Sequence, residues 1–316
     1  MSKTLNRVQE HMEEAKQYFP MKNIVGIFLQ GSQNYGLETS NSDVDTKLIV
    51  TPAFRQIAFN KQPVSSTHVR ANNEHIDFKD LRLYMDMFRK QNINFVEILF
   101  TKYRILNDAY ADEFMRLIDA REAVAHYNMW RAVKAMKGMA HEKHHAMEHR
   151  YPAKQDIVQK YGYDGKQLSH LIRIKDFLSR YISGESYGSC LKANDRGYLI
   201  ALKNQGYYSL ETAREVANET IEVVDYIADD FCSSHPDEFD ADTEALLQDV
   251  QYNIMERSVK AELMPGKEDQ DEENSNALKI AKRYDGIYAQ IRALEQEAEK
   301  TKQELIGALL SESHNA

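Results

Sequence analysis

The stretch that decides the fold is residues 31–45, which read Gly-Ser-Gln-Asn-Tyr-Gly-Leu-Glu-Thr-Ser-Asn-Ser-Asp-Val-Asp. The preceding residues 24–29, Ile-Val-Gly-Ile-Phe-Leu, form a continuous apolar run rich in β-branched side chains, which is typical of a buried strand. Residues 43–50 have the composition of a second strand, and Pro52 ends it. The order of strand, Gly-Ser, polar loop and Asp-x-Asp is more informative than any of these features alone.

The two aspartates of the second strand, Asp43 and Asp45, are spaced for metal binding. Side chains two residues apart on a strand point to the same face, about 6.5 to 7 Å apart, so both carboxylates can reach one metal pair. Asp77 repeats this arrangement on a later strand. Phosphoryl transfer commonly uses two ions about 3.5 to 4 Å apart. Hard oxygen ligands favour magnesium, so we expect two Mg²⁺ ions, or Mn²⁺ in their place, held by these three catalytic carboxylates.

The Gly31-Ser32 pair, with Gly36 five residues after the first glycine, is a candidate phosphate-binding element. Glycine lets backbone amides approach a phosphate, the serine hydroxyl adds a donor, and a following helical turn would present its N-terminal amides. An isolated Gly-Ser after a strand is usually a simple turn. Its position before Asp-x-Asp makes nucleotide binding the preferred interpretation.

The rest of the first third alternates between helix and strand. We expect a helix over residues 5–19 and a hairpin in which residues 64–69 pair with residues 74–79 around an Asn-Asn turn. Asp80 can cap a helix that runs to about residue 90. From Asp108 onward the pattern is helical, with long helices over residues 122–149, 164–183 and 210–231. The predicted fold class is α+β, with the strands in the first third and a mainly helical region after it.

These patterns divide the chain into four parts. They are a catalytic domain over residues 1–107, a helical domain for substrate or nucleotide over 108–264, an acidic linker over 265–276, and a coiled-coil-like helix over 277–312. The last part is a possible site of homo-oligomerisation, although the same stripe could pack on the protein's own helices. The stripe consists of Ile280, Tyr284, Ile287, Ile291, Leu294, Ala298, Thr301, Leu305 and Ala308.

One predicted helix carries cations on a single face. Asp164 can cap it and Gln167 can complete a capping box, while Lys166, His170 and Arg173 follow at steps of three and four residues. Such a face is ordinarily just solvated, but near the carboxylates it would suit the phosphates of a nucleotide or an acceptor. The residues 141, 145 and 149 are histidines on one helix face, for which a surface helix is a simpler explanation than zinc binding.

Composition limits the class of protein. The formal net charge of −9 argues against a surface built to coat nucleic acid without regard to sequence. Cys190 and Cys232 are far apart and suggest neither a disulfide framework nor a zinc ribbon. No apolar run is long enough to span a membrane and the first residues lack the apolar core of a signal peptide, so the expectation is a cytoplasmic protein without a membrane partner.

Taken together, residues 31–45 resemble the signature of the DNA polymerase β nucleotidyltransferase superfamily. More narrowly, the chain is similar over about residues 21–185 to the RNA-repair-associated nucleotidyltransferases of bacteria and phages. The similarity includes Asn-Phe-Val-Glu-Ile-Leu-Phe at 94–100 and Tyr-Asp-x-Lys-x-x-x-His-x-x-Arg at 163–173. Relatives often place a glycine soon after Asp-x-Asp, whereas Thr46 and Lys47 stand here.

The resemblance implies a small mixed sheet whose first two strands carry the Gly-Ser and Asp-x-Asp elements. The expected reaction is in-line attack of an acceptor hydroxyl on the α-phosphorus of a nucleoside triphosphate, with release of pyrophosphate. Asp43 and Asp45 would bind both metals, Ser32 would hold the outer phosphates, and Asp77 would lie closest to the acceptor. The acceptor could be an RNA end or, as in the minimal nucleotidyltransferases paired with toxins, a protein side chain. A nucleotide-binding or assembly module without catalysis is the third alternative.

Overall fold

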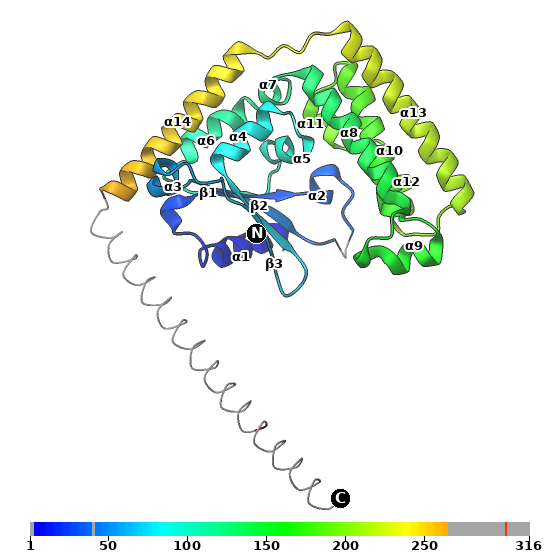
Figure 1. The fold of residues 1–316 in the computed structure, drawn as a ribbon, viewed down its shortest axis with the longest axis horizontal. Helices are drawn as coiled ribbons and strands as arrows, with labels where there is room; N and C mark the ends of the chain where they lie inside the picture. Colours follow the sequence, from blue (N-terminus) through cyan, green and yellow to red (C-terminus); the bar gives the residue numbers. More distant parts are fainter. Residues whose placement is uncertain (1–2, 40–41, 265–300, 302–316) are drawn as a thin grey trace, which may run out of the picture. The chain divides into compact units, whose positions relative to one another are not determined.

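The computed structural model describes residues 3–39, 42–264 and 301 (Figure 1). The sheet and the helices that surround it belong to one compact unit, Met1–Glu262. The acidic linker predicted at 265–276 lies outside the described residues, and so does the helix predicted at 277–312 apart from residue 301. Within the described ranges, no helix is long and apolar enough to cross a membrane.

A mixed sheet of five strands in the order β3-β4-β2-β1-β5 forms the centre of the first part of the chain. β2 and β4 run parallel, and the other neighbouring strands are antiparallel. The predicted α+β class is therefore confirmed. The strands are β1 (Ile24–Gln30), β2 (Asp45–Val50), β3 (Ser65–Val69), β4 (His75–Asp80) and β5 (Arg104–Leu106).

The register of the sheet brings the polar residues of three strands to one end. Gln30 of β1 pairs with Asp45 of β2, and Lys47 of β2 pairs with Asp77 of β4. β2 begins at Asp45, two residues later than predicted, so Asp43 belongs to the loop before the strand. The predicted hairpin is present as β3 and β4, and Asn73 in its turn has a positive φ of 64°.

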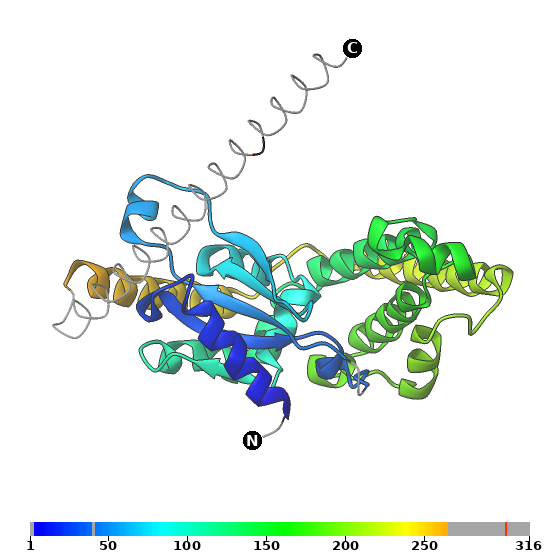
Figure 2. The ribbon, with the colours of Figure 1, turned by 90° about the horizontal axis from the view of Figure 1, so that it is seen from below.

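Helices cover both faces of the sheet (Figure 2). α1 (Lys3–Ala15) packs Val8 and Met12 against side chains of β1 and β2 such as Ile27 and Leu48. It ends at Ala15 rather than at the predicted Phe19, and turns follow it. Because successive side chains of a strand alternate between faces, Phe28 of β1 points to the other side, where α4 (Leu81–Arg89) and α6 (Ala111–Asp119) lie.

Capping residues define several helix ends. Asp80 caps α4 as predicted, because its carboxylate accepts a hydrogen bond of 2.9 Å from the backbone N–H of Arg82. The single helix predicted over residues 122–149 is divided into α7 (Arg121–Ala125) and α8 (Met129–Glu148). The break occurs because Asn128 adopts an extended conformation and caps α8 through the N–H of Arg131.

The remaining helices surround α10 (Gly165–Ile182), which contacts α8, α12 (Arg196–Lys203) and α13 (Leu210–Ser234). One apolar core continues from Phe28 of the sheet to Leu171 of α10. The division predicted between residues 107 and 108 thus falls inside one compact unit, and it stays a prediction. The other helices are α2 (Ser32–Tyr35), α3 (Phe54–Ala58), α5 (Ile93–Val96), α9 (Gln155–Tyr161), α11 (Tyr187–Leu191) and α14 (Ala241–Leu263), with 3-10 turns η1 (Met21–Asn23), η2 (Glu97–Leu99) and η3 (Pro152–Lys154).

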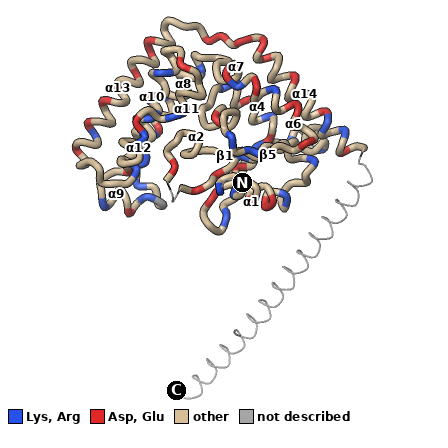
Figure 3. Tube along the Cα trace, turned by 180° about the vertical axis from the view of Figure 1, so that it is seen from behind, with Lys and Arg blue, Asp and Glu red and all other residues tan. Residues whose placement is uncertain are grey.

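The negative charge of the chain is unevenly distributed. Acidic residues occur along the whole of α13, including Asp225, Asp229 and Asp230, whereas Lys and Arg recur on α10 and α12 (Figure 3). The net charge of −9 is therefore not spread evenly over the protein surface. A local site for an anion is compatible with this acidic chain.

α14 returns to the sheet at the end of the unit. The hydroxyl of Ser258 lies 2.6 Å from that of Thr51, directly after β2. The guanidinium of Arg257 binds Asp112 and Glu113 on α6 at distances between 2.6 and 3.1 Å. The last described helix therefore packs on residues from the first third of the chain.

Candidate functional site

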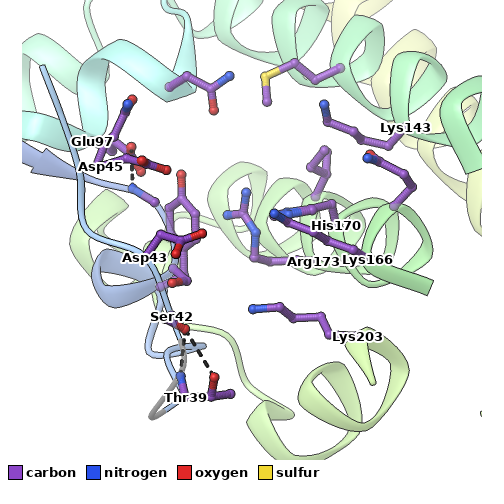
Figure 4. Close-up of a pocket in the computed structure, with 18 of the residues that line it drawn as sticks. Thr39, Ser42, Asp43, Asp45, Glu97, Lys143, Lys166, His170, Arg173 and Lys203 are labelled. Atoms are coloured by element: carbon purple, nitrogen blue, oxygen red, sulfur yellow. Dashed lines mark hydrogen bonds between the residues drawn. The ribbon is translucent and has the colours of Figure 1, made fainter. Parts of the chain in front are cut away.

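A pocket of about 650 Å³ opens between the polar end of the sheet and the helices α8, α10 and α12 (Figure 4). The two sets of residues expected from the sequence meet in this pocket, although more than 80 residues separate them. Those that line it are Gly31, Ser32, Asp43, Asp45, Asp77, Lys166, His170 and Arg173. Gly36 is not among its lining residues, because it ends α2 with a positive φ of 72° and shapes the turn instead.

Carboxylates form one wall of the pocket. Asp45, at the start of β2, accepts a hydrogen bond of 2.8 Å from the backbone N–H of His75 on β4. Asp43 is exposed in the preceding loop, while Val44 between them is buried. Both aspartates line the same pocket. Only Asp45 lies on a strand, so only its side-chain direction is set by strand geometry.

Asp77 is the third carboxylate, and both of its oxygens have partners. Oδ1 accepts a hydrogen bond of 2.6 Å from Thr67, and Oδ2 lies 3.3 Å from the amide nitrogen of Gln30 and 3.5 Å from Nζ of Lys47. Burial by itself would raise the pKa of Asp77, but the hydrogen bond from Thr67 and the charge of Lys47 outweigh it and lower the pKa. Asp77 is therefore ionised and already paired.

No three His, Cys, Asp or Glu side chains of the described residues are grouped closely enough to hold a metal ion together. The chemistry of the donors still fits a hard cation, because Asp43, Asp45 and Asp77 all present carboxylate oxygens to one cavity. Among the described residues, no lysine or arginine pairs with Asp43 or Asp45, and Nδ1 of His75 lies 3.3 Å from Oδ1 of Asp45.

Lys47 is a pocket residue that sequence reasoning did not assign. It is only 4% exposed, and its ammonium lies 4.6 Å from the centre of the Phe95 ring as well as beside Asp77. Burial lowers its pKa, which Asp77 and Glu97 oppose by favouring the charged form. The ammonium of Lys47 thus lies among the carboxylates of this wall of the pocket.

Glu97 is a second buried charge that the sequence did not single out, although it belongs to the 94–100 motif. It is 1% exposed, and its Oε1 accepts a hydrogen bond of 3.1 Å from the N–H of Gly31. Burial raises its pKa to about 7 against the opposing effects of Tyr35, Lys47 and Gly31.

The amide of Gly31 was expected to face a phosphate, and it binds Glu97 instead. Gly31 has φ 90° and ψ −146°, a conformation that requires glycine. Ser32, the first residue of α2, lines the pocket. The hydrogen bond to Glu97 thus holds the Gly-Ser turn in place. Of the two residues, Ser32 is the one available to bind a ligand.

Cations form the opposite wall (Figure 4). Lys166 and Arg173 project from α10, as the helical spacing predicted, and Lys143 of α8 and Lys203 of α12 join them. Asp164 caps α10 through the N–H of Lys166 at 2.9 Å. Gln167 does not complete the predicted capping box, because the N–H of Asp164 donates to the carbonyl of Met147.

Arg173 has the features of a ligand-binding side chain. It is 2% exposed, and its guanidinium lies 3.8 Å from the centre of the Tyr35 ring. Its Nε and Nη1 atoms have no hydrogen-bond partner among the described residues. Since a buried guanidinium without acceptors is costly, an anion at this position would be stabilised.

His170 was expected on the same helix face as the two cations, and it lines the pocket beside them. Burial, together with the charges of Arg173 and Lys166, lowers its pKa well below the ordinary value. It is therefore neutral near pH 7 and can donate or accept a hydrogen bond. The positive charge of this wall comes from the lysines and the arginine.

The histidines at 141, 145 and 149 have contacts outside the pocket. His141 hydrogen bonds to Asp225 of α13 at 2.7 Å, and the rings of His145 and His149 pack with centroids 5.4 Å apart. The segment thus joins α8 to α13. Its contribution to the pocket is Lys143.

Two sets of contacts hold the pocket loops. Behind Asp43 and Asp45, Glu74 accepts hydrogen bonds from the N–H of Val44 at 2.9 Å and from His11 of α1 at 3.0 Å. Arg7, Arg70 and Asn72 also bind this carboxylate. Burial would raise the pKa of Glu74, but these partners lower it to about 2. The Asp-x-Asp segment is thereby anchored to α1.

The second set of contacts anchors the loop after α2. Three cationic side chains donate to backbone carbonyls of α2 and of this loop: Lys192 to Asn34 of α2 at 2.7 Å, Lys203 to Leu37 at 3.1 Å, and Arg196 to Glu38 at 3.0 Å and to Gly36. The helical region therefore holds the Gly-Ser turn and its loop in place from outside the sheet.

Comparison with known proteins gives little further information. No protein-family model matches the chain, and no curated protein sequence matches it. Among solved structures, the chain is similar to a nucleotidyltransferase-like protein from Exiguobacterium sibiricum 255-15, with 9% identity over 71% of this chain and 74% of that one. The TM-score between the two structures is 0.26.

Proposed function

We propose that this protein is a nucleotidyltransferase that moves a nucleoside monophosphate from a nucleoside triphosphate to a hydroxyl acceptor. The observation that supports the proposal is the opposition of two walls in one pocket. Asp43, Asp45 and Asp77 lie on the side of the sheet, and Lys166 and Arg173 lie on the side of the helices. A metal-bound polyphosphate needs both kinds of charge.

The acidic wall supplies ligands for a divalent cation. Asp43 and Asp45 would hold magnesium, or manganese in its place, and Asp77 is the third carboxylate of the wall. A bound divalent cation supplies neutralisation of the charge that develops on the α-phosphate during transfer. Glu74 keeps Val44 in place, so the two aspartates are directed before any ligand arrives.

The basic wall would bind the phosphates. Arg173 offers Nε and Nη1 without partners in the described part of the chain, and Lys166 projects from the same face of α10. Ser32 at the N-terminus of α2 adds a hydroxyl donor. These groups would orient the triphosphate so that pyrophosphate leaves on the side of the helices.

The acceptor hydroxyl would approach from the side of Asp77. Because its pKa is lowered and Lys47 pairs with it, Asp77 is better suited to orient the hydroxyl than to retain its proton. An RNA end is the acceptor that we propose first, and a protein side chain is the alternative.

The test is incubation of the protein with each of four α-³²P-labelled nucleoside triphosphates, Mg²⁺, total RNA and lysate protein. Label in the RNA fraction would support an RNA acceptor, and label in the protein fraction would support a protein acceptor. An Asp43→Asn/Asp45→Asn double variant is the control for contaminating enzymes. Absence of transfer to either fraction, together with absence of nucleotide binding, would refute the proposal.

A further inference from the structure

A buried lysine occupies the part of the acidic wall where a second cation would be expected. Lys47 lies on β2, a strand with neighbours on both sides, and its register partner on β4 is Asp77. Its Nζ is 3.5 Å from Asp77 Oδ2, and its side chain is 5% exposed. In two-metal sites the ions lie about 3.5 to 4 Å apart and share the carboxylates of the protein. Here an ammonium already neutralises one of those carboxylates.

We propose that the Lys47 ammonium replaces one of the two divalent cations, so that the loaded site holds a single ion bound by Asp43 and Asp45. This inference rests on the proposed function, because it concerns how the same pocket binds a metal nucleotide. It alters the two-ion expectation that the sequence raised.

The surroundings of Lys47 hold its ammonium beside Asp77. The ring of Phe95 covers it at 4.6 Å, and its backbone is fixed between β1 and β4. If a divalent ion displaced it from Asp77, the ammonium would remain in the interior without its closest carboxylate. A buried unpaired charge is strongly unfavourable, so the ion pair resists displacement.

Asp77 is also poorly available to a metal. Thr67 donates to Oδ1 at 2.6 Å, and Gln30 and Lys47 approach Oδ2. A second divalent ion would have to break these contacts while lying next to a positive charge, which repels it. Within the described residues, Asp43 and Asp45 pair with no lysine or arginine, although Nδ1 of His75 lies 3.3 Å from Oδ1 of Asp45, so they remain the ligands of one ion.

The number of ions can be counted without measuring transfer. Wild-type protein is saturated with α,β-methylene ATP, which cannot be cleaved at the bond that reacts, and protein-bound Mn²⁺ is measured by equilibrium dialysis. Electron paramagnetic resonance then distinguishes an isolated Mn²⁺ from a coupled pair. We expect one isolated Mn²⁺ per bound nucleotide in the wild type and two in Lys47→Met, which keeps the length of the side chain but removes its charge.

Two further variants control for charge and for folding. Lys47→Arg keeps a cation and should bind one ion. Lys79→Met removes a lysine of β4 whose Nζ contacts Ser65 outside the pocket, and it should also bind one. Thermal melting identifies any variant that is not folded. If Lys47→Met does not fold, the number of Mn²⁺ ions bound by the wild type and by Lys47→Arg decides whether the site holds one ion or two.

The outcomes separate the two proposals. Two coupled Mn²⁺ ions in the wild type, with nucleotide bound, would overturn this inference and leave the proposed function intact. One ion in both the wild type and a folded Lys47→Met variant would also overturn it, because the lysine would not be what excludes the second. If no nucleotide analogue binds the wild type, with or without Mn²⁺, both proposals fail.

Discussion

The carboxylate of Glu74 should contribute about 3 kcal/mol to the folding free energy at neutral pH. Folding lowers its pKa from 4.5 to about 2, and each pKa unit corresponds to about 1.4 kcal/mol. Its side chain is 4% exposed, so solvent screens it little. Glu74→Gln keeps the shape but removes the buried negative charge that Arg7 and Arg70 contact. A loss of this size should lower Tm by roughly 5 °C in a protein of this length.

The effect should depend on pH in a defined direction. A carboxyl group whose pKa falls on folding stabilises the protein above its unfolded pKa, and this contribution is lost as the pH falls from 4.5 towards 2. The difference in stability between wild type and Glu74→Gln should therefore be largest at pH 7 and about half as large near pH 3.

Urea denaturation followed by circular dichroism at both pH values measures this difference. Glu14→Gln is a matched control, because Glu14 of α1 also binds Arg70 but is more exposed, at 26%. Its loss should cost less than about 1 kcal/mol. The reasoning is wrong if Glu74→Gln costs no more than Glu14→Gln at pH 7, or if its cost is the same at pH 7 and pH 3.

The remaining predictions concern the pocket and the tail. Asp43→Asn or Asp45→Asn should reduce transfer by at least about 100-fold at an unchanged Tm, because asparagine keeps the shape but not the charge; transfer near wild-type level would refute the metal assignment. Nucleotide should raise Tm only when a divalent cation is present, and an equal shift with chelator would contradict a metal-bridged triphosphate. Arg173→Lys should weaken nucleotide binding about tenfold in calorimetry, since a point charge cannot reproduce two guanidinium contacts; unchanged binding would mean that Arg173 does not contact the nucleotide. Truncation after Gly266 should yield a monomer if the tail oligomerises, whereas an unchanged mass in light scattering would contradict an intermolecular coiled coil.

The sequence predicted features that depend on local patterns. The strand at 24–29, the hairpin around Asn73 and the cap at Asp80 all follow from hydrophobic periodicity or from side chains that bind nearby backbone. The helical face of Lys166 and Arg173 was predicted for the same reason. Their position opposite the aspartates was expected only from the resemblance, because no local pattern specifies how α10 packs against the sheet.

The residues that were missed owe their importance to tertiary contacts. A lysine at position 47 has no pattern that distinguishes it from an exposed strand residue, and its role depends on Asp77 and Phe95, which come from other elements. Glu97 likewise matters because Gly31 lies next to it. The stop of α1 at Ala15 and the break at Asn128 show that periodicity continues past helix ends which a cap or a turn determines.

The return of α14 to the sheet has a consequence for how the chain folds as it is synthesised. Thr51 leaves the ribosome long before Ser258, its hydrogen-bond partner 207 residues later. The N–H of Phe54 likewise has no partner until Glu262 has been synthesised. Contacts so distant in sequence form slowly, because a long loop must close before they contribute. The apolar side chains that α14 adds to the core, such as Leu247 and Ile254, are thus missing during most of translation, and the apolar residues that they cover are then exposed to chaperones or to other nascent chains.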